Sequence, residues 1–161
     1  MQIYKTFFIN NCLIKKTCLM REAHYQKEDS RTRQGSEAFD GFIIIKPGFL
    51  SLGDEVYKEL IDSGFQIIST KEKTLTRAEA EAIYEMHRGK MFFDELVGYM
   101  SGGESVGIEV KSPYEGHEEA IDAVNEIKQR FRKYSIDKTR NVLHSSDSHE
   151  NVIRESAIYF R

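Results

Sequence analysis

The stretch Phe42-Ile43-Ile44-Ile45-Lys46-Pro47-Gly48 (FIIIKPG) decides how this chain is organised. Four consecutive apolar residues are typical of a buried strand. The strand must end at Lys46, because the Pro-Gly pair that follows indicates a turn. We therefore expect a compact domain that begins near Phe39 and has this strand as its first element.

From this strand to the C-terminus, helical and extended patterns alternate along the chain. Helices are indicated by apolar residues three and four positions apart, and strands by short apolar or alternating runs. Gly64 supplies the C-terminal stop of the first helix, and Thr76 with Glu79 forms a capping-box signature for the second. We expect strands over residues 42–45, 65–69, 106–110 and 141–143, helices over 54–63, 76–87, 93–100 and 120–134, and a last helix that starts at the capping-box pair Asp147 and Glu150.

The order of these elements is strand, helix, strand, two helices, strand, helix, strand. This order matches the split βαβ plan, which is also called ferredoxin-like. We therefore predict an α+β fold in which helices pack mainly on one face of a four-stranded antiparallel sheet. Because this plan supports many different activities, the fold by itself names no function.

The N-terminal segment differs in character from the rest of the chain. Residues 21–38 are polar and turn-rich, which is typical of a linker. We expect residues 1–38 to form a poorly ordered extension and residues 39–161 to form a single domain. The two cysteines, Cys12 and Cys18, lie in the extension at a spacing that matches no common metal site or disulfide framework.

The overall composition excludes several classes of protein. The formal net charge of the 161 residues is -3, so no global electrostatic attraction favours nucleic acid. No run approaches the roughly 18 apolar residues that are needed to span a bilayer, so we expect no membrane partner. The N-terminal apolar run is interrupted by two asparagines and is only weakly signal-like. A passive extension from an upstream start and a targeting segment both remain open for this region, and we expect a cytoplasmic protein.

The segment Asn141-Val142-Leu143-His144-Ser145-Ser146-Asp147-Ser148 carries the most chemistry. A short apolar run leads one histidine into a cluster of hydroxyls and a carboxylate. Glu155 lies eleven residues beyond His144, so a helix that folds back would place its carboxylate beside the imidazole. A histidine oriented by a carboxylate is a candidate nucleophile or proton carrier. Chemistry alone leaves open the alternative of a surface histidine at a strand-to-helix turn.

The surroundings of this histidine follow a specific pattern. Asn141 precedes His144 by three residues, and Ser146 and Asp147 follow it by two and three. Together with Ile45 to Gly48, Tyr84, Phe92-Phe93 and Glu155, the segment from Arg140 to Ser148 resembles nucleoside diphosphate kinase over about residues 40–160.

The resemblance implies a ping-pong phosphotransfer. His144 would attack the γ-phosphate of ATP or of another nucleoside triphosphate, become phosphohistidine, and pass the phosphate to a nucleoside diphosphate. Glu155 would fix the tautomer of the imidazole, and Ser146 would hold Glu155 in place. Mg²⁺ would arrive with the nucleotide and would need few or no ligands from the protein.

The resemblance also implies how the nucleotide is bound. Lys46 and Tyr84 would stabilise charge on the transferred phosphoryl group. Phe92 would stack on a base of any kind, and Asn141 would hydrogen-bond a sugar hydroxyl. Each residue has an alternative interpretation: Lys46 as a solvated strand end, Tyr84 and Phe92 as core aromatics, and Asp147 and Ser148 as helix caps alone.

Two features depart from the family pattern. A long loop between the third and fourth strands, whose Thr and Arg residues grip the phosphates, is absent here, and Ser145 stands where the family usually has Gly. Arg88, Arg130 and Arg132 are candidate substitutes for the missing phosphate ligands. The alternative for the basic run over residues 128–133 is a solvated helix end that suits the helix dipole.

These departures leave two hypotheses for the function. The first is an active nucleoside diphosphate kinase with a truncated nucleotide-gripping loop, and the intact His144, Glu155 and Lys46 favour it. The second is a non-catalytic nucleotide-binding or assembly module with the same fold, which the missing loop favours. In either case the resemblance implies a homo-oligomer.

Overall fold

A computed structural model describes residues 39–161, which belong to one compact unit. The predicted extension over residues 1–38, with both cysteines, lies outside the described residues. Within the described part of the chain, no helix is long and apolar enough to cross a membrane.

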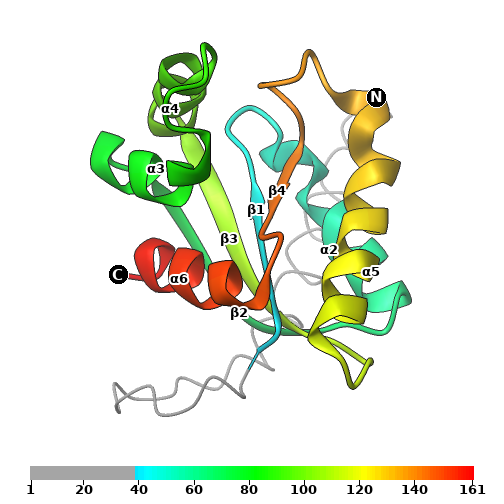
Figure 1. The fold of residues 1–161 in the computed structure, drawn as a ribbon. Helices are drawn as coiled ribbons and strands as arrows, with labels where there is room; N and C mark the ends of the chain where they lie inside the picture. Colours follow the sequence, from blue (N-terminus) through cyan, green and yellow to red (C-terminus); the bar gives the residue numbers. More distant parts are fainter. Residues whose placement is uncertain (1–38) are drawn as a thin grey trace, which may run out of the picture. The chain divides into compact units, whose positions relative to one another are not determined.

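Residues 39–161 form one four-stranded antiparallel sheet and five α-helices (Figure 1). The strand order is β2-β3-β1-β4, so β1 and β3 lie in the centre of the sheet. The predicted α+β class and ferredoxin-like plan are confirmed. The strands are β1 (Gly41–Ile45), β2 (Gln66–Thr74), β3 (Glu104–Lys111) and β4 (Leu143–Ser145), and the helices are α2 (Gly53–Asp62), α3 (Arg77–Ile83), α4 (Phe93–Ser101), α5 (His117–Arg130) and α6 (His149–Tyr159).

Helices cover both faces of the sheet, which corrects the prediction that they lie mainly on one face. Figure 1 shows α2 and α5 on one side of the strands and α3, α4 and α6 on the other. The reason lies in β1, in which all five residues are buried. Ile43 and Ile45 belong to the core under α2 and α5, whereas Phe42 and Ile44 belong to the core under α3, α4 and α6. A strand with apolar side chains on both faces requires cover on both.

The second helix begins as predicted but ends earlier. Thr76 and Glu79 form the expected capping box, in which each side chain satisfies a backbone N–H of the other residue. The α-helix then stops at Ile83, and Tyr84 leads into a short 3₁₀ turn over Glu85–His87. The helix end therefore presents the Tyr84 ring at a corner of the fold instead of within a continuous helix.

The last helix is capped by Ser148, one of the two residues considered as caps, and not by the expected capping box. Ser148, in extended conformation, is the N-cap, and its hydroxyl accepts a hydrogen bond from the Asn151 backbone N–H at 3.2 Å. Asp147 instead accepts from the side-chain amide of Asn151 at 2.6 Å. The predicted Asp147–Glu150 capping box is wrong, because the hydroxyl one residue later lies closer to the first helical N–H groups.

The pairing of β1 with β4 brings the two most informative stretches of the sequence together. Ile44 lies opposite His144, and Ile45 lies opposite Leu143. The backbone N–H of Lys46 continues the ladder with a 2.9 Å hydrogen bond to the Val142 carbonyl. The end of the FIIIKPG stretch and the histidine motif are therefore neighbours at one edge of the sheet.

Helix α6 is held against β3 at a glycine. A Cβ atom on Gly107 would lie 2.5 Å from the ring of Tyr159, so only glycine lets the ring approach the strand. The Tyr159 hydroxyl also hydrogen-bonds Ser105 at 2.8 Å, and Ser156 donates to the buried carboxylate of Glu109. These contacts fix the position of α6, which carries Glu155.

We expect Gly107→Ala to lower the free energy of unfolding by about 1–3 kcal/mol, because the added methyl group overpacks the Tyr159 contact. Denaturant unfolding followed by circular dichroism measures this change. Gly98→Ala in α4 is the matched control, since no heavy atom lies within 4 Å of its added Cβ, and it should be neutral or stabilising. Equal stability of the two variants would contradict the close packing of Tyr159 on Gly107 that holds α6 against β3.

Candidate active site

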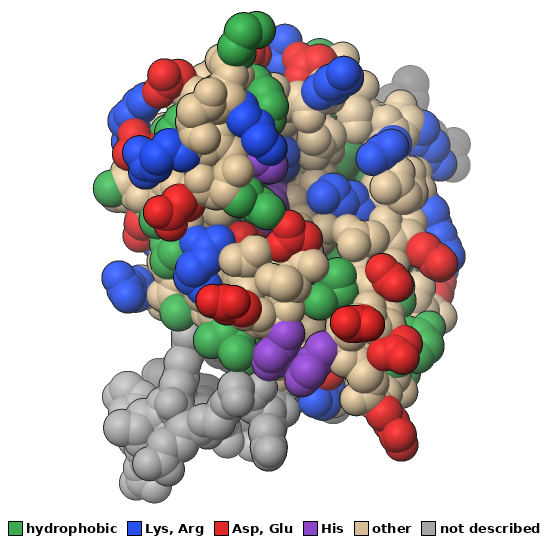
Figure 2. All heavy atoms as spheres, viewed as in Figure 1, with side chains coloured by type: hydrophobic (Ala, Val, Ile, Leu, Met, Phe, Trp, Pro, Cys, Tyr) green, Lys and Arg blue, Asp and Glu red, His purple; other side chains and the backbone are tan. Residues whose placement is uncertain are grey.

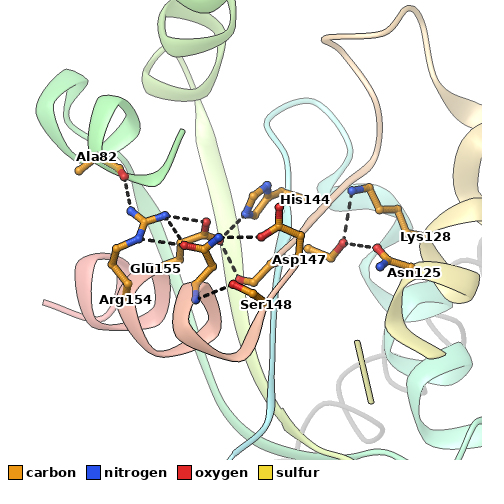
Figure 3. Close-up of polar contacts among 11 residues, drawn as sticks. Ala82, Asn125, Lys128, His144, Asp147, Ser148, Arg154 and Glu155 are labelled. Atoms are coloured by element: carbon orange, nitrogen blue, oxygen red, sulfur yellow. Dashed lines mark hydrogen bonds and ion pairs between the residues drawn. The ribbon is translucent and has the colours of Figure 1, made fainter. Parts of the chain in front are cut away.

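The candidate site is built around His144 on β4 and Glu155 on α6 (Figure 3). The Nε2 atom of His144 lies 2.7 Å from Oε2 of Glu155, and this carboxylate is only 1% exposed. Ser146 donates to the same oxygen at 2.7 Å, and Arg154 donates to the other oxygen at 3.1 Å. Both oxygens of the carboxylate are therefore held, which fixes the orientation of the imidazole.

The hydrogen bond to Glu155 determines the protonation of the ring. A carboxylate is an acceptor only, so Nε2 of His144 carries the proton and Nδ1 carries the lone pair. Within residues 39–161, Nδ1 makes no hydrogen bond, and His144 lines a pocket of about 340 Å³. The arrangement thus offers an oriented ring nitrogen as a nucleophile to a molecule in that pocket.

Lys46 and Tyr84 lie beside the imidazole. The rings of Tyr84 and His144 meet edge to face with centroids 4.9 Å apart, and the Lys46 ammonium lies 5.9 Å from the centre of the Tyr84 ring. Lys46 donates to the Thr139 carbonyl at 3.2 Å. Both side chains are buried and line the pocket, which rules out the alternative of a solvated strand end for Lys46.

The ionisation of these two residues is shifted by burial. Burial, followed by repulsion from Lys128, lowers the pKa of Lys46 to about 7, although Asp137 acts in the opposite direction. Burial also raises the pKa of Tyr84 well above its usual value, so the hydroxyl keeps its proton. Lys46 therefore changes charge near neutral pH, whereas Tyr84 remains a hydrogen-bond donor.

Two buried polar atoms in the pocket have no partner among the described residues. They are the hydroxyl oxygen of Tyr84 and Oδ1 of Asn141. The side-chain amide of Asn141 donates to the Lys138 carbonyl at 2.7 Å, which orients its free oxygen. Because unpaired buried polar groups are unfavourable, these atoms indicate that a polar molecule completes the site.

Phe92 forms the outer wall of the pocket. Its ring is 41% exposed and packs edge to face on His87 at 5.4 Å, with the Lys90 ammonium 5.9 Å from its centre. Phe92 is not a core residue, and its exposed face is available for stacking.

The three arginines considered as phosphate ligands lie in different places. Arg130 is paired with Glu59 and lines a separate pocket, so it is not brought to His144. Arg88 lies over the Phe93 ring and is not among the residues that line the His144 pocket. Arg132 lines an adjoining pocket of about 400 Å³, which shares Asn141 with the first.

Several residues of the site were missed by sequence reasoning. Lys128 on α5 lines both pockets, and Arg154 joins Glu155 to the Ala82 carbonyl of α3. Lys128 belongs to the basic run that the sequence marked as a solvated helix end. Its position after the buried Val124 and before the buried Phe131 was the signal that this lysine is turned inward. For Arg154, the only signal was its place next to Glu155.

Comparison with known proteins gives a consistent result. A family model described as nucleoside diphosphate kinase matches residues 40–161. The nucleoside diphosphate kinase of Ignicoccus hospitalis is 35% identical over 128 residues, which cover 74% of this chain and 87% of that protein. That of Fervidobacterium nodosum is 34% identical over 127 residues, with coverage of 74% and 86%. An orthorhombic crystal form of the Aquifex aeolicus nucleoside diphosphate kinase superposes with a TM-score of 0.65 at 31% identity and covers 75% of this chain and 94% of that one.

Glu155→Gln is expected to slow phosphotransfer more than tenfold at saturating nucleotide, which corresponds to about 1.4 kcal/mol or more of transition-state stabilisation. The amide keeps the shape of the side chain but no longer stabilises positive charge on the ring or holds one tautomer. Steady-state rates give the change, with kcat expected to fall and KM to stay nearly constant. Glu150→Gln, an exposed change five residues earlier on α6, is the control. A parental rate in the Glu155 variant would exclude a supporting role for this carboxylate.

The shifted pKa of Lys46 predicts a pH dependence of binding. Since its pKa is lowered to about 7 in the free protein, Lys46 loses its proton as the pH rises from 7 to 9, and an anionic phosphate must restore that proton in order to bind. The affinity for ADP should therefore fall by up to about tenfold per pH unit over this range. Lys46→Met, which has no proton to lose, should bind ADP more weakly and without this slope. Calorimetric titration at several pH values measures both curves, and parallel curves would show that Lys46 does not bind the phosphate.

Proposed function

Because the chain belongs to the nucleoside diphosphate kinase family, we propose that His144 is the residue that carries the phosphate between nucleotides. The activity of this chain is that of a nucleoside diphosphate kinase, a phosphotransferase. The family match and the relatives that cover most of the chain support this activity. The observation that supports His144 as the nucleophile is its geometry: Nε2 is held by Glu155, and Nδ1 is left open to the pocket.

In the first half-reaction, the lone pair of His144 Nδ1 attacks the γ-phosphorus of a nucleoside triphosphate. A P–N bond forms while the P–O bond to the β-phosphate breaks, and a nucleoside diphosphate leaves with the bonding electrons. Positive charge that develops on the ring is stabilised by Glu155, whose carboxylate accepts hydrogen bonds from Ser146 and Arg154. In the second half-reaction, the terminal phosphate oxygen of another nucleoside diphosphate attacks the phosphohistidine and reverses these steps.

Lys46 and Tyr84 act on the group that moves. Their ammonium and hydroxyl donors stand beside the imidazole, where the equatorial oxygens of the transferred phosphoryl group gain charge. The hydroxyl of Tyr84 has no partner within residues 39–161, and a phosphoryl oxygen would satisfy it. These donors are in place before the substrate arrives, so little reorganisation is needed during the reaction.

The rest of the nucleotide is held by Phe92 and Asn141. The exposed ring of Phe92 stacks on the base, and stacking discriminates poorly between bases because every base has a π-face. The free oxygen of Asn141 is an acceptor, so it suits a sugar hydroxyl, which donates. We therefore expect ATP and other nucleoside triphosphates to be used with similar efficiency.

Mg²⁺ is the cofactor that this reaction implies. Among the described residues, no three His, Cys, Asp or Glu side chains are arranged to hold a metal ion. The pocket presents cations and neutral groups, which suits a substrate whose phosphate oxygens bring their own Mg²⁺. The ion, when bound, neutralises phosphate charge, and Lys46 and Tyr84 orient the phosphates.

Three further properties complete the proposal. We infer a cytoplasmic homo-oligomer in which residues 39–161 form the catalytic domain and residues 1–38 an extension. Light scattering of the purified protein reads the oligomeric state. The second hypothesis, a non-catalytic nucleotide-binding or assembly module, is disfavoured by the orientation of His144, whose Nε2 is held by a Glu155 carboxylate that is itself hydrogen-bonded at both oxygens.

His144→Ala is expected to abolish phosphoenzyme formation while the fold remains intact, because no other histidine of the described chain combines a buried carboxylate partner with an open pocket. The protein is incubated with γ-labelled ATP and Mg²⁺, and acid-labile label is counted. The parent should retain label that ADP discharges, and the variant should retain none. Nucleotide binding by the parent without any label would instead support the non-catalytic module, and acid-labile label in the variant would move the nucleophile elsewhere.

A further inference from the structure

We propose that Lys128 and Lys46 together form a clamp for the phosphate chain of the nucleotide, with Lys128 supplying from a helix the charge that a loop would otherwise supply. This inference rests on the proposed function and adds a binding residue to it. Lys128 was expected at a solvated helix end, but it reaches the same pocket as His144 and Lys46.

The position of Lys128 is set by a short chain of hydrogen bonds. Its ammonium donates to the Ser145 hydroxyl at 3.2 Å, and that hydroxyl donates in turn to the side-chain oxygen of Asn125 at 3.0 Å (Figure 3). Ser145 directly follows His144 on β4, and Asn125 lies one turn before Lys128 on α5. The bonds hold the ammonium beside the strand that carries the nucleophile, and they use only one of its three donors.

The charge of Lys128 is not neutralised by its neighbours. No carboxylate of residues 39–161 lies within ion-pair distance of Lys46 or Lys128, whereas Lys58, Lys73 and Lys111 each pair with a carboxylate. Burial, followed by repulsion from Arg132, lowers the pKa of Lys128, and the more distant Asp147 and Glu155 oppose this shift. Lys128 in turn lowers the pKa of Lys46.

Two partly or fully buried cations that repel each other are unfavourable without an anion between them. A phosphate chain relieves this repulsion and forms charge-assisted hydrogen bonds with both. Figure 2 shows Lys and Arg side chains on both sides of the hollow between the α4 and α5 sides of the molecule, with a histidine between them. The site is therefore open to an anion.

The clamp predicts how affinity depends on the number of phosphates. Lys128→Met should weaken the binding of ADP by roughly ten- to a hundredfold, the value of one charge-assisted hydrogen bond. Adenosine carries no phosphate, so its binding should be unchanged. Lys128→Arg keeps the charge and should retain most of the ADP affinity. Ser145→Gly removes the positioning hydroxyl and should give a smaller loss for ADP and none for adenosine.

Calorimetric titration of the full chain with ADP and with adenosine, each with Mg²⁺, tests these expectations. Lys133→Met is the matched control, because Lys133 packs over Tyr134 and lines a different pocket. Arg132→Ala tests the neighbouring cation. The clamp would be overturned if Lys128→Met bound ADP as tightly as the parent, or if it lost affinity for ADP and adenosine equally. It would also be overturned if only Arg132→Ala lost affinity for ADP. Circular dichroism verifies that each variant is folded, and Lys128→Gln replaces Lys128→Met if the latter is not.

The same samples separate this inference from the proposed function. If the parent forms acid-labile phosphoenzyme and Lys128→Met binds ADP normally, only the clamp fails. If the parent forms no phosphoenzyme, and Lys128→Met binds ADP more weakly than the parent does, the clamp holds and the proposed nucleophile fails.

Discussion

The buried carboxylate of Glu155 is the constraint on which the site depends. An ionised carboxylate at 1% exposure is strongly unfavourable unless each oxygen is hydrogen-bonded. The fold meets this requirement with His144 on β4, with Ser146 directly after that strand, and with Arg154 on the same helix as Glu155. The three donors that stabilise the buried charge also orient the imidazole, so one network serves both stability and chemistry.

This network requires that α6 and β4 meet at a defined distance, and the sheet provides it. The pairing of β1 with β4 sets the position of His144, and the close approach of Tyr159 to Gly107 sets the position of α6 on β3. A shift of either element by one residue would separate the histidine from its carboxylate. The central strand β1, buried on both faces, is therefore the support for a site that lies at the sheet edge.

The positive side of the site is built differently from its carboxylate side. Lys46 directly follows β1 and Lys128 lies in the last turn of α5, and neither is paired with an acid in the described chain. Neither ammonium has a carboxylate counter-ion among the described residues, and the clamp that we propose follows from this. In that proposal, the negative charge of the substrate completes an arrangement that is unfavourable when empty.

The sequence by itself determined the order of the elements and the proximity of His144 to Glu155. Apolar periodicity indicated the order of strands and helices, and the eleven-residue spacing from His144 to Glu155 indicated that one helix returns to the histidine, since both are local properties of the chain. Only the tertiary structure decided which face of the sheet each helix covers, why Ser148 and not Asp147 caps α6, and which cation of the basic run on α5 enters the site. Arg130 and Lys128 are two residues apart and equivalent in the sequence, yet one pairs with Glu59 and the other reaches Ser145. The direction of a side chain on a helix depends on what the helix packs against, and that is fixed by contacts between residues far apart in the chain.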